Sequence, residues 1–391
     1  MTDIFAALGE RFERADRQLF LVGGSVRDMV LGREPKDLDF TTDALPDEIE
    51  GILKDWADAI WDVGREFGTI AARKDDQDIE ITTFRFDGPG RKPQVTFTDD
   101  LIEDLKRRDF TINAMAMPVS HLGLHNHASD IVDPFGGLAH INTRTIDTPG
   151  TPEVTFHEDP LRMLRAARFA SQLSFNVAPR VVEAMGFKRL MIQDISAERI
   201  AAELDKLLLG DDPERGLAML RRTGLLELIL PEVDTLPWTL LGDDVETRWA
   251  DLLSAVDIAD VAQRMRALKF SLDRQRDVTA LVRLRNEFDG IVWFDAEVRK
   301  VLAASGPQFL RLVKLLRASD TLLPLAIKLL AKEGFPVPVL NGKDVINLLG
   351  IKPGPKVGEA LDFLWNLRLE TGPMTVNEAQ LALMNWDKVT A

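Results

Sequence analysis

The sequence of 391 residues contains no cysteine, which excludes disulfide bonds, thiolate zinc sites and cysteine nucleophiles. It also lacks any apolar run long enough to span a membrane. The first twenty residues scatter acidic and basic side chains among apolar ones, which makes a poor signal peptide and a fair amphipathic helix. We therefore expect a cytoplasmic globular protein without membrane contact, and the length favours two or more domains.

Positive charge and histidine are both scarce. The chain has 48 Lys and Arg against 63 Asp and Glu, a net charge of −15, which argues against indiscriminate binding to nucleic acid. Local basic clusters nevertheless occur, among them residues 106–108 and 162–168. All five histidines precede residue 158, so the remainder of the chain cannot supply a histidine metal site.

The residue pattern changes once along the chain, near residue 150. Up to about residue 150, short segments rich in β-branched and aromatic residues alternate with turns, and from Pro152 onward helical periodicity takes over. Strands are expected at residues 18–22, 38–41, 68–73 and 79–84. The predicted fold class is therefore α+β, an α/β head followed by a long helical remainder.

A glycine pair, Gly23-Gly24, follows the first predicted strand and precedes a predicted helix. Glycines at such a turn let backbone N–H groups approach a phosphate closely, and the helix presents its positive end to that anion. Arg27 in the first helical turn would add a bidentate phosphate contact. Gly23, Gly24 and Ser25 are therefore candidate nucleotide-binding residues, although such a turn taken alone is more often structural.

Two aspartates alternate with apolar residues in the segment Lys36-Asp37-Leu38-Asp39-Phe40. On a strand, this alternation places Asp37 and Asp39 on one face. Adjacent carboxylates repel each other, and a cation between them relieves the repulsion. Magnesium accepts one or two carboxylates together with water and substrate phosphates. Because the phosphate turn lies just upstream, we predict a catalytic magnesium site here instead of two exposed strand acids.

Glu80 is a candidate third acid on a later predicted strand. It stands between Ile79 and Ile81 in the segment DIEITTFR. Either it assists the metal site in catalysis, or it is simply the polar side of an alternating strand.

Three polar residues, Arg108, Asp109 and Asn113, form another candidate group, which begins at the last basic residue of the cluster 106–108. Arg108 is a candidate contact of the triphosphate, and Asp109 and Asn113 can hydrogen-bond ribose hydroxyl groups. Alternatively, Asp109 caps a helix that begins here.

A second candidate group follows the segment His157-Glu158-Asp159-Pro160, whose capping Asp and Pro predict a helix start. Asp159 and Arg162 are one turn apart on the same side of this helix, and Arg165 and Arg168 turn progressively around it. Taken by itself, the pattern is typical of a capped helix with solvent-facing arginines.

Hydrogen-bond chemistry suggests a role for Asp159 and Arg162. Cytosine and adenine both offer an amino donor beside a ring-nitrogen acceptor, which a carboxylate and a guanidinium complement. Guanine and uracil present the reverse order, and each buried polar group left unpaired costs about 1–3 kcal/mol. The pair therefore suits an enzyme that accepts CTP and ATP without a nucleic-acid template.

Together these segments resemble the class II tRNA nucleotidyltransferase and bacterial poly(A) polymerase family. LVGGSVRD with KDLDF resembles its catalytic motif, DLKRRDFTINAMA its ribose-binding motif, and EDPLRMLRAARF its template for the incoming base. VGREFGTI and EITTFR resemble its next strands. ISAERIAAEL resembles the helix that buttresses the template, with Glu198, Arg199 and Glu203 at matching positions. The resemblance is dense over residues 18–233 and thinner in INLLGIKPGPKVGEAL.

The resemblance implies a polymerase-β-like head at residues 1–150, a helical neck with the base-recognition helix at 151–235, and a helical body and tail at 236–391 that bind tRNA. The implied reaction is attack of the RNA 3′ hydroxyl on the α-phosphate of CTP or ATP, assisted by two magnesium ions, with pyrophosphate leaving. This reaction rebuilds the CCA end of tRNA. The implied magnesium ligands are Asp37 and Asp39, and the implied nucleotide contacts are Gly24, Arg27, Arg108, Asp159, Arg162, Arg165 and Arg168.

Two departures from the family pattern stand out. Many bacterial relatives carry an HD phosphohydrolase module after the neck, but here the corresponding segment has no histidine ligands. We therefore predict no phosphohydrolase activity. The segment between Arg85 and Asp104, where the family places a flexible loop needed for the switch to ATP, looks a few residues short and keeps Arg91 and Lys92. This leaves addition of CC alone as an alternative.

Three further alternatives remain. A poly(A) polymerase usually has a basic C-terminal extension, which this acidic chain lacks. A catalytically silent RNA-binding protein would not need paired metal carboxylates. A nucleotidyltransferase for small molecules or proteins would not need a helical body long enough to span the acceptor arm of tRNA.

Overall fold

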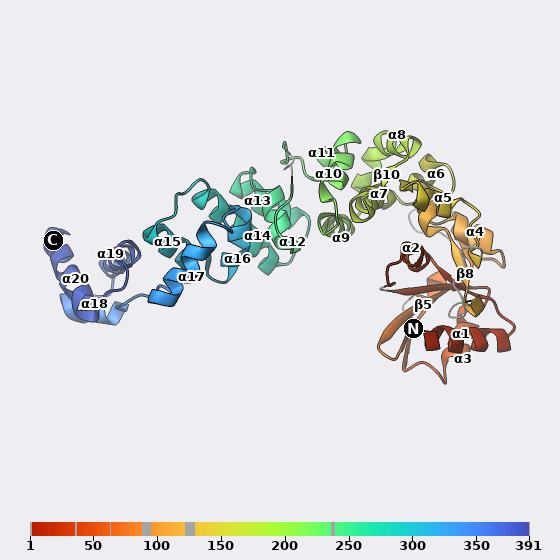
Figure 1. The fold of residues 1–391 in the computed structure, drawn as a ribbon, viewed down its shortest axis with the longest axis horizontal. Helices are drawn as coiled ribbons and strands as arrows, with labels where there is room; N and C mark the ends of the chain where they lie inside the picture. Colours follow the sequence, from red (N-terminus) through yellow and green to blue (C-terminus); the bar gives the residue numbers. More distant parts are fainter. Residues whose placement is uncertain are drawn as a thin grey trace. The chain divides into compact units, whose positions relative to one another are not determined.

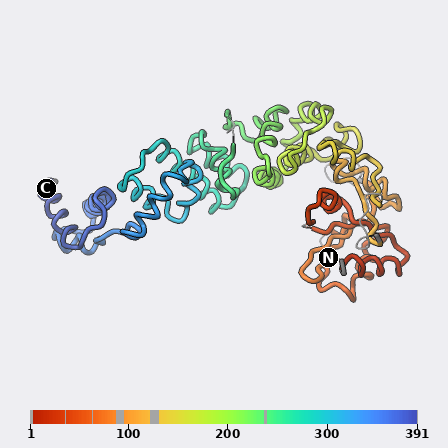
Figure 2. Tube along the Cα trace, viewed as in Figure 1, coloured from red at the N-terminus to blue at the C-terminus, as the bar shows by residue number. Residues whose placement is uncertain are grey.

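The computed structural model describes residues 2–35, 37–62, 64–87, 95–121, 130–235 and 239–390. The chain forms two compact units, Met1–Leu236 and Pro237–Ala391. The first unit combines sheet and helices, whereas the described residues of the second form helices without strands (Figure 1). Figure 2 shows the chain trace of the same two units, coloured by residue number. No helix in the described ranges is long and apolar enough to cross a membrane.

A six-stranded mixed sheet forms the core of the head, with strand order β3-β4-β5-β2-β1-β8. The neighbours β2 and β5 are parallel, and the other pairs are antiparallel. The described residues also form two small two-stranded sheets, β6-β7 and β9-β10. Their bounds are β1 Leu19–Val22, β2 Leu38–Thr42, β3 Ala59–Trp61, β4 Thr69–Lys74, β5 Gln77–Thr83, β6 Arg85–Asp87, β7 Val95–Phe97, β8 Ala116–Pro118, β9 Thr145–Ile146 and β10 Asn176–Val177.

Helices of the first unit surround this sheet and continue beyond it, and α1 and α3 lie beside each other on one of its faces (Figure 1). The segments 65–67, 111–113, 119–121 and 189–194 are short 3-10 helices. The α-helices are α1 Thr2–Arg14, α2 Gly24–Val30, α3 Pro46–Leu53, α4 Leu101–Lys106, α5 Gly137–Asn142, α6 Pro152–Glu158, α7 Leu161–Leu173, α8 Pro179–Lys188, α9 Ala197–Leu208, α10 Pro213–Arg222 and α11 Leu226–Ile229.

In the second unit, a buried ion pair joins three helices. Arg299 on α15 donates to both carboxylate oxygens of Glu333 at the end of α17, at 2.8 and 2.9 Å, and to the backbone carbonyl of Leu369 on α19. Its helices are α12 Val245–Leu252, α13 Ile258–Ala267, α14 Leu272–Phe288, α15 Asp295–Ser305, α16 Phe309–Leu315, α17 Leu322–Glu333, α18 Gly342–Leu349, α19 Pro355–Thr371 and α20 Val376–Thr390, with a 3-10 turn at Gly306–Gln308.

The predicted α+β fold class is confirmed. Each of the four expected strands is present within two residues of its expected ends. The predicted N-terminal amphipathic helix is α1, which buries Ile4, Phe5, Leu8 and Phe12. The predicted helix start at Pro160 is one residue early, because α7 begins at Leu161.

Candidate active site

Elements of the head and of α7 enclose one polar cavity of about 520 Å³ within the first unit. Twelve of the fourteen predicted site residues line it, and Ser25 and Glu80 do not. The structure therefore brings the glycine turn, the paired aspartates and the second basic cluster to one place. The lining residues are Gly23, Gly24, Arg27, Asp37, Asp39, Arg107, Arg108, Asp109, Asn113, Asp159, Leu161, Arg162, Arg165, Arg168, Phe169, Gln172 and Arg199.

The charge of the cavity is opposite to that of the chain. Seven arginines and four aspartates line it, whereas the whole sequence has a net charge of −15. Guanidinium groups bind phosphate oxygens in bidentate fashion, and a walled cleft of one sign raises the local concentration of its counter-ion. The cavity is therefore suited to a polyanionic ligand such as a nucleoside triphosphate.

The glycine turn forms one wall. Gly23 has φ +71°, a left-handed conformation that favours glycine, and the helix α2 begins directly after it. A methyl group built on Gly23 would lie 3.2 Å from Nη1 of Arg108 and 3.8 Å from Oδ2 of Asp39. The backbone conformation therefore favours glycine, and a side chain here would crowd Arg108. The turn lies directly beside the segment Asp37–Asp39 that leads into β2, here called the metal strand.

Ser25 serves this turn indirectly. Its side chain is buried, and its hydroxyl donates to the backbone carbonyl of Asp37 at 2.7 Å. Ser25 thus ties α2 to the start of β2 and does not itself line the cavity, where the sequence had placed it as a nucleotide contact.

The metal strand presents two carboxylates without partners. Asp37 is exposed and Asp39 half-buried, and neither carboxylate makes a hydrogen bond or ion pair with another described residue. Burial raises the pKa of Asp39, and the charges of Glu80 and Asp37 raise it further against the opposing charge of Arg108. A cation held by both carboxylates would favour their ionised forms.

Glu80 lies directly beside Asp39, since the two residues are paired in the parallel register of β2 and β5. It is exposed and stands outside the cavity lining. No group of three or more metal-ligating side chains occurs in the described part of the chain. The protein would thus supply two carboxylates, which suits magnesium completed by water and phosphate oxygens. The assistance of Glu80 stays a prediction.

Asp109 and Asn113 form a hydrogen-bonded pair at the cavity wall. Oδ1 of Asp109 accepts from Nδ2 of Asn113 at 2.9 Å and from the backbone N–H of Phe110 at 2.8 Å. Arg27 donates to Oδ1 of Asn113 at 2.8 Å. The alternative that Asp109 caps a helix is wrong, because residues 111–113 form one 3-10 turn without a side-chain cap.

Arg165 and Arg168 are held by buried acids. Arg165 donates to Oδ2 of Asp109, and Arg168 lies 2.9 Å from Glu203 on α9. Burial and the charge of Arg165 lower the pKa of Arg168 to about 10, so Arg168 remains charged at neutral pH. Both line the cavity as charges fixed by the fold, and their predicted contact with nucleotide stays a prediction.

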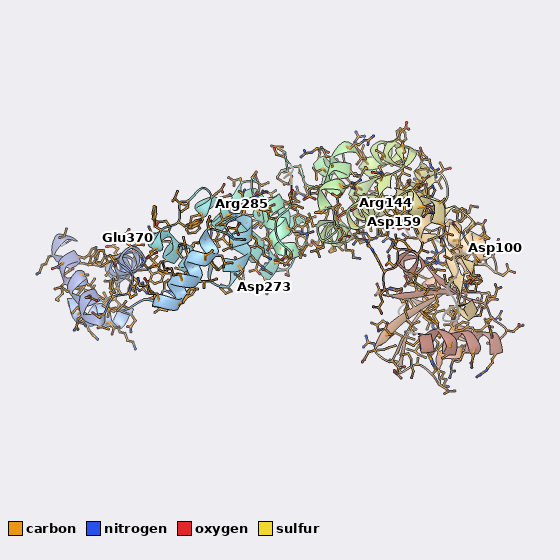
Figure 3. The ribbon with its side chains drawn as sticks, in the orientation of Figure 1. Asp100, Arg144, Asp159, Asp273, Arg285 and Glu370 are labelled. Carbon is orange, nitrogen blue, oxygen red and sulfur yellow. The ribbon has the colours of Figure 1, made fainter. Side chains whose placement is uncertain are left out.

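The side chains of Asp159 and Arg162 line the cavity but do not bond to each other. Asp159, labelled in Figure 3, accepts from Nη2 of Arg199 at 2.9 Å and from the backbone N–H of Leu161 at 3.1 Å. Arg162 donates to Glu158 at 2.9 Å and to the backbone carbonyl of Arg107 at 2.7 Å. Base recognition by Asp159 and Arg162 would therefore require them to exchange or share these partners.

Sequence reasoning did not identify Phe169 as a site residue. Its buried ring lies under the guanidinium groups of Arg27, Arg165 and Arg168, at 5.1, 5.5 and 4.2 Å from their Cζ atoms. Such cation–π contacts hold arginines from α2 and α7 on one platform. Phe169 lies on the same helical face as Arg165 and Arg168, which could have indicated a role in the site. Most apolar residues of α7, however, belong to the core.

The Asp109–Arg165 pair predicts a pH dependence of stability. Burial opposes ionisation, but Arg165 and Asn113 lower the pKa of Asp109 to about 2. A depressed pKa contributes stability above the unfolded value, and this contribution disappears as the pH falls through the folded one. We expect Asp109→Asn to remove about 2 kcal/mol of unfolding free energy at pH 6, and this difference to shrink as the pH falls from 4 toward 2.

Chemical denaturation of wild type and D109N at several pH values measures this difference. Asp55→Asn, at an exposed acid of the same unit, is the control and should show almost no difference at any pH. A D109N difference that stays constant down to pH 2 would contradict the ion-pair assignment.

A polymerase-β-like head with paired strand carboxylates beside a glycine turn and an arginine-lined cavity defines a nucleotidyltransferase. The Poly A polymerase head domain family matches residues 19–147, and the family described as the probable RNA and SrmB-binding site of polymerase A matches residues 174–236. The CCA-adding enzyme of Geobacillus stearothermophilus is 35% identical over 370 residues, 88% of this chain and 87% of that protein. The CCA-adding enzyme of Pediococcus pentosaceus is 32% identical over 97% of this chain and 96% of its own length.

This chain belongs to the CCA-adding enzyme family, as the sequence motifs predicted. The crystal structure of the Bacillus stearothermophilus CCA-adding enzyme in complex with CTP matches with a TM-score of 0.79 and 32% identity, over 98% of this chain and 96% of that one. A Thermotoga maritima CCA-adding enzyme complexed with tRNA shares the fold at a TM-score of 0.66 and 20% identity, over 98% and 95% of the two chains. Arg91 and Lys92 of the predicted loop lie outside the described residues.

Proposed function

We propose that this enzyme rebuilds the CCA end of tRNA, adding CMP and AMP from CTP and ATP to the 3′ hydroxyl without a nucleic-acid template. The observation that carries the proposal is the single cavity that joins the carboxylates of Asp37 and Asp39 to the base-reading candidates Asp159 and Arg162. The tRNA substrate and a cytoplasmic location belong to the same proposal.

The triphosphate end of the nucleotide would lie between the glycine turn and the arginines of the head. Gly23, Gly24, Arg107 and Arg108 all line the cavity. They would hold the phosphates and stabilise charge that develops on the transferring phosphoryl group. The 3′ hydroxyl of the RNA forms the new bond to the α-phosphorus, and the bond to the departing pyrophosphate breaks.

Asp37 and Asp39 would hold magnesium at the reacting phosphate. Bound there, magnesium supplies Lewis-acid stabilisation of the phosphoryl oxygens and favours the ionised hydroxyl nucleophile. Neither carboxylate is bonded to another described residue, and burial raises the pKa of Asp39; both support this assignment, since a bound cation would stabilise the ionised carboxylates. Glu80 beside Asp39 adds to the negative field of the site.

Asp159 and Arg162 would select the base. The carboxylate accepts from the amino group of cytosine or adenine, and the guanidinium donates to the adjacent ring nitrogen. Asp159 is about one-third exposed and Arg199, its present partner, about one-half, so the carboxylate can be reached from the cavity. Guanine and uracil would leave two polar groups without partners.

A primer-extension assay tests the proposal. The protein is incubated with magnesium and tRNA that lacks CCA, ends in C or ends in CC, with CTP and ATP added singly and together. We expect CTP alone to complete the CC sequence, and ATP to add one A only to tRNA ending in CC. Arrest after CC with both nucleotides would indicate a CC-adding enzyme, and long A tracts a poly(A) polymerase. No extension of any substrate would refute nucleotidyl transfer to tRNA.

A further inference from the structure

One buried carboxylate, that of Asp104, does not line the cavity and has no role in the proposed catalysis or nucleotide binding. Asp104 on α4 is fully buried, at 0% exposure, although aspartate is seldom fully buried unless paired. Its oxygens accept hydrogen bonds from four different residues, and all four lie outside its own helix. Such a carboxylate links several segments of the chain and restricts the positions of the groups that bond to it.

Two of its partners are the arginines of the triphosphate end. Arg107 donates to Oδ1 of Asp104 from Nε at 3.0 Å and from Nη2 at 2.8 Å, and Arg108 donates to Oδ2 at 3.2 Å. Among the described residues this is the one side-chain hydrogen bond of Arg108, whose buried Nε has no partner. The charge of Asp104 therefore fixes one edge of the Arg108 guanidinium and leaves Nη1 beside the glycine turn.

The other two partners anchor Asp104 to the sheet. The hydroxyl of Thr41 lies 3.2 Å from Oδ2, and the backbone N–H of Arg85 donates to Oδ1 at 3.3 Å. Thr41 is on β2, two residues after Asp39 and hence on the same face of the strand. The position of the two guanidinium groups is thereby set relative to the metal strand itself.

A free Arg108 would have another acidic partner close by. A Cβ at Gly23 would lie 3.2 Å from Nη1 of Arg108 and 3.8 Å from Oδ2 of Asp39, so the two charged groups flank the same turn. Without Asp104, the guanidinium would be drawn toward this carboxylate, which no other described side chain neutralises. It would then neutralise the metal site and leave the phosphates without their donor.

We propose that Asp104 is a positioning residue, which sets the Arg107 and Arg108 guanidinium groups for the triphosphate of the incoming nucleotide and keeps Arg108 off Asp39. The inference rests on the proposed function, since it concerns the binding of CTP and ATP. It predicts a defect confined to the phosphates, because the proposed base contacts are Asp159 and Arg162 and the proposed ribose contacts are Asp109 and Asn113.

Equilibrium binding of CTP and of CMP to Asp104→Asn, measured without tRNA, tests this inference. Hydrogen bonds to charged groups contribute about 1.5–3 kcal/mol, so we expect CTP binding to weaken roughly 10- to 100-fold. CMP lacks the β- and γ-phosphates, and its affinity should change by less than about threefold. Glu103→Gln, at the exposed neighbour that pairs with Lys106, is the matched control and should leave both affinities unchanged.

A purely structural role of Asp104 would weaken CTP and CMP binding equally, and that result would overturn the inference. Asp104→Ser, which leaves room for water beside the Arg85 N–H, is the second variant and should show the same CTP-specific loss. Failure of both variants to fold would show that Asp104 serves the fold alone and would also overturn it. Absence of CTP binding by the wild type would refute the proposed function, whereas normal CTP binding by a folded D104N refutes only this inference.

Discussion

Asp39→Ala is expected to abolish nucleotide transfer while leaving tRNA binding intact. The half-buried carboxylate lies near Asp37, Glu80 and the glycine turn, and its removal takes away one of the two proposed protein ligands for magnesium. Loss of metal-assisted charge stabilisation amounts to several kcal/mol, so the single-turnover rate should fall at least about 10³-fold. Incorporation of labelled CMP into tRNA lacking CCA measures the rate.

A matched control separates this effect from a general loss of acid. Glu34→Ala removes an exposed acid a few residues before the metal strand and should leave the rate unchanged. Binding of tRNA to D39A, measured by filter retention or fluorescence anisotropy, should match the wild type. A normal transfer rate in D39A would refute the metal assignment.

Asp159→Asn combined with Arg162→Gln is expected to relax the choice of nucleotide. The amide at position 159 can donate to the carbonyl oxygen of uracil or guanine, and the amide at 162 can accept from the ring N–H. The original pair offers the opposite order, an acceptor at 159 and a donor at 162. Two polar groups at about 1–3 kcal/mol each correspond to a loss of CTP-over-UTP preference of about 10²-fold or more. Competition between CTP and UTP, read from the ratio of their kcat/KM values, measures it.

The structure adds a second consequence of these substitutions. Arg162 also bonds to the Arg107 carbonyl, and Asp159 to Arg199, so total activity should fall as well. Glu153→Gln, at an exposed acid of α6, is the control and should keep both rate and preference. Unchanged selectivity in a folded double variant would refute base recognition by this pair.

Local patterns were enough to predict the parts of the site that depend on one strand or one turn. Period-two alternation predicted the strand β2 that carries Asp39, whereas Asp37 lies one residue before the strand begins at Leu38; both aspartates line the cavity. The paired glycines predicted the tight turn before α2, because positive φ at Gly23 is a local requirement. The meeting of these segments in one cavity was inferred from the family resemblance.

Long-range pairings were not predictable in this way. The bond from Arg199 to Asp159 spans 40 residues, and that from Arg162 to the Arg107 carbonyl spans 55. Sequence spacing identifies which side chains share a helix face, but tertiary packing decides which of several acids an arginine meets. Ser25 shows the same limit, since its hydroxyl turns inward to the Asp37 carbonyl and away from the cavity.

The central claim is that Asp37 and Asp39 hold a divalent cation beside a triphosphate bound at the Gly23-Gly24 turn. Anomalous scattering from manganese in crystals grown with CTP locates both cation and phosphates. The account predicts manganese between the two carboxylates, in contact with triphosphate oxygens, with the cytosine base toward Asp159 and Arg162. Manganese bound elsewhere, or a triphosphate bound away from the glycine turn, would contradict it.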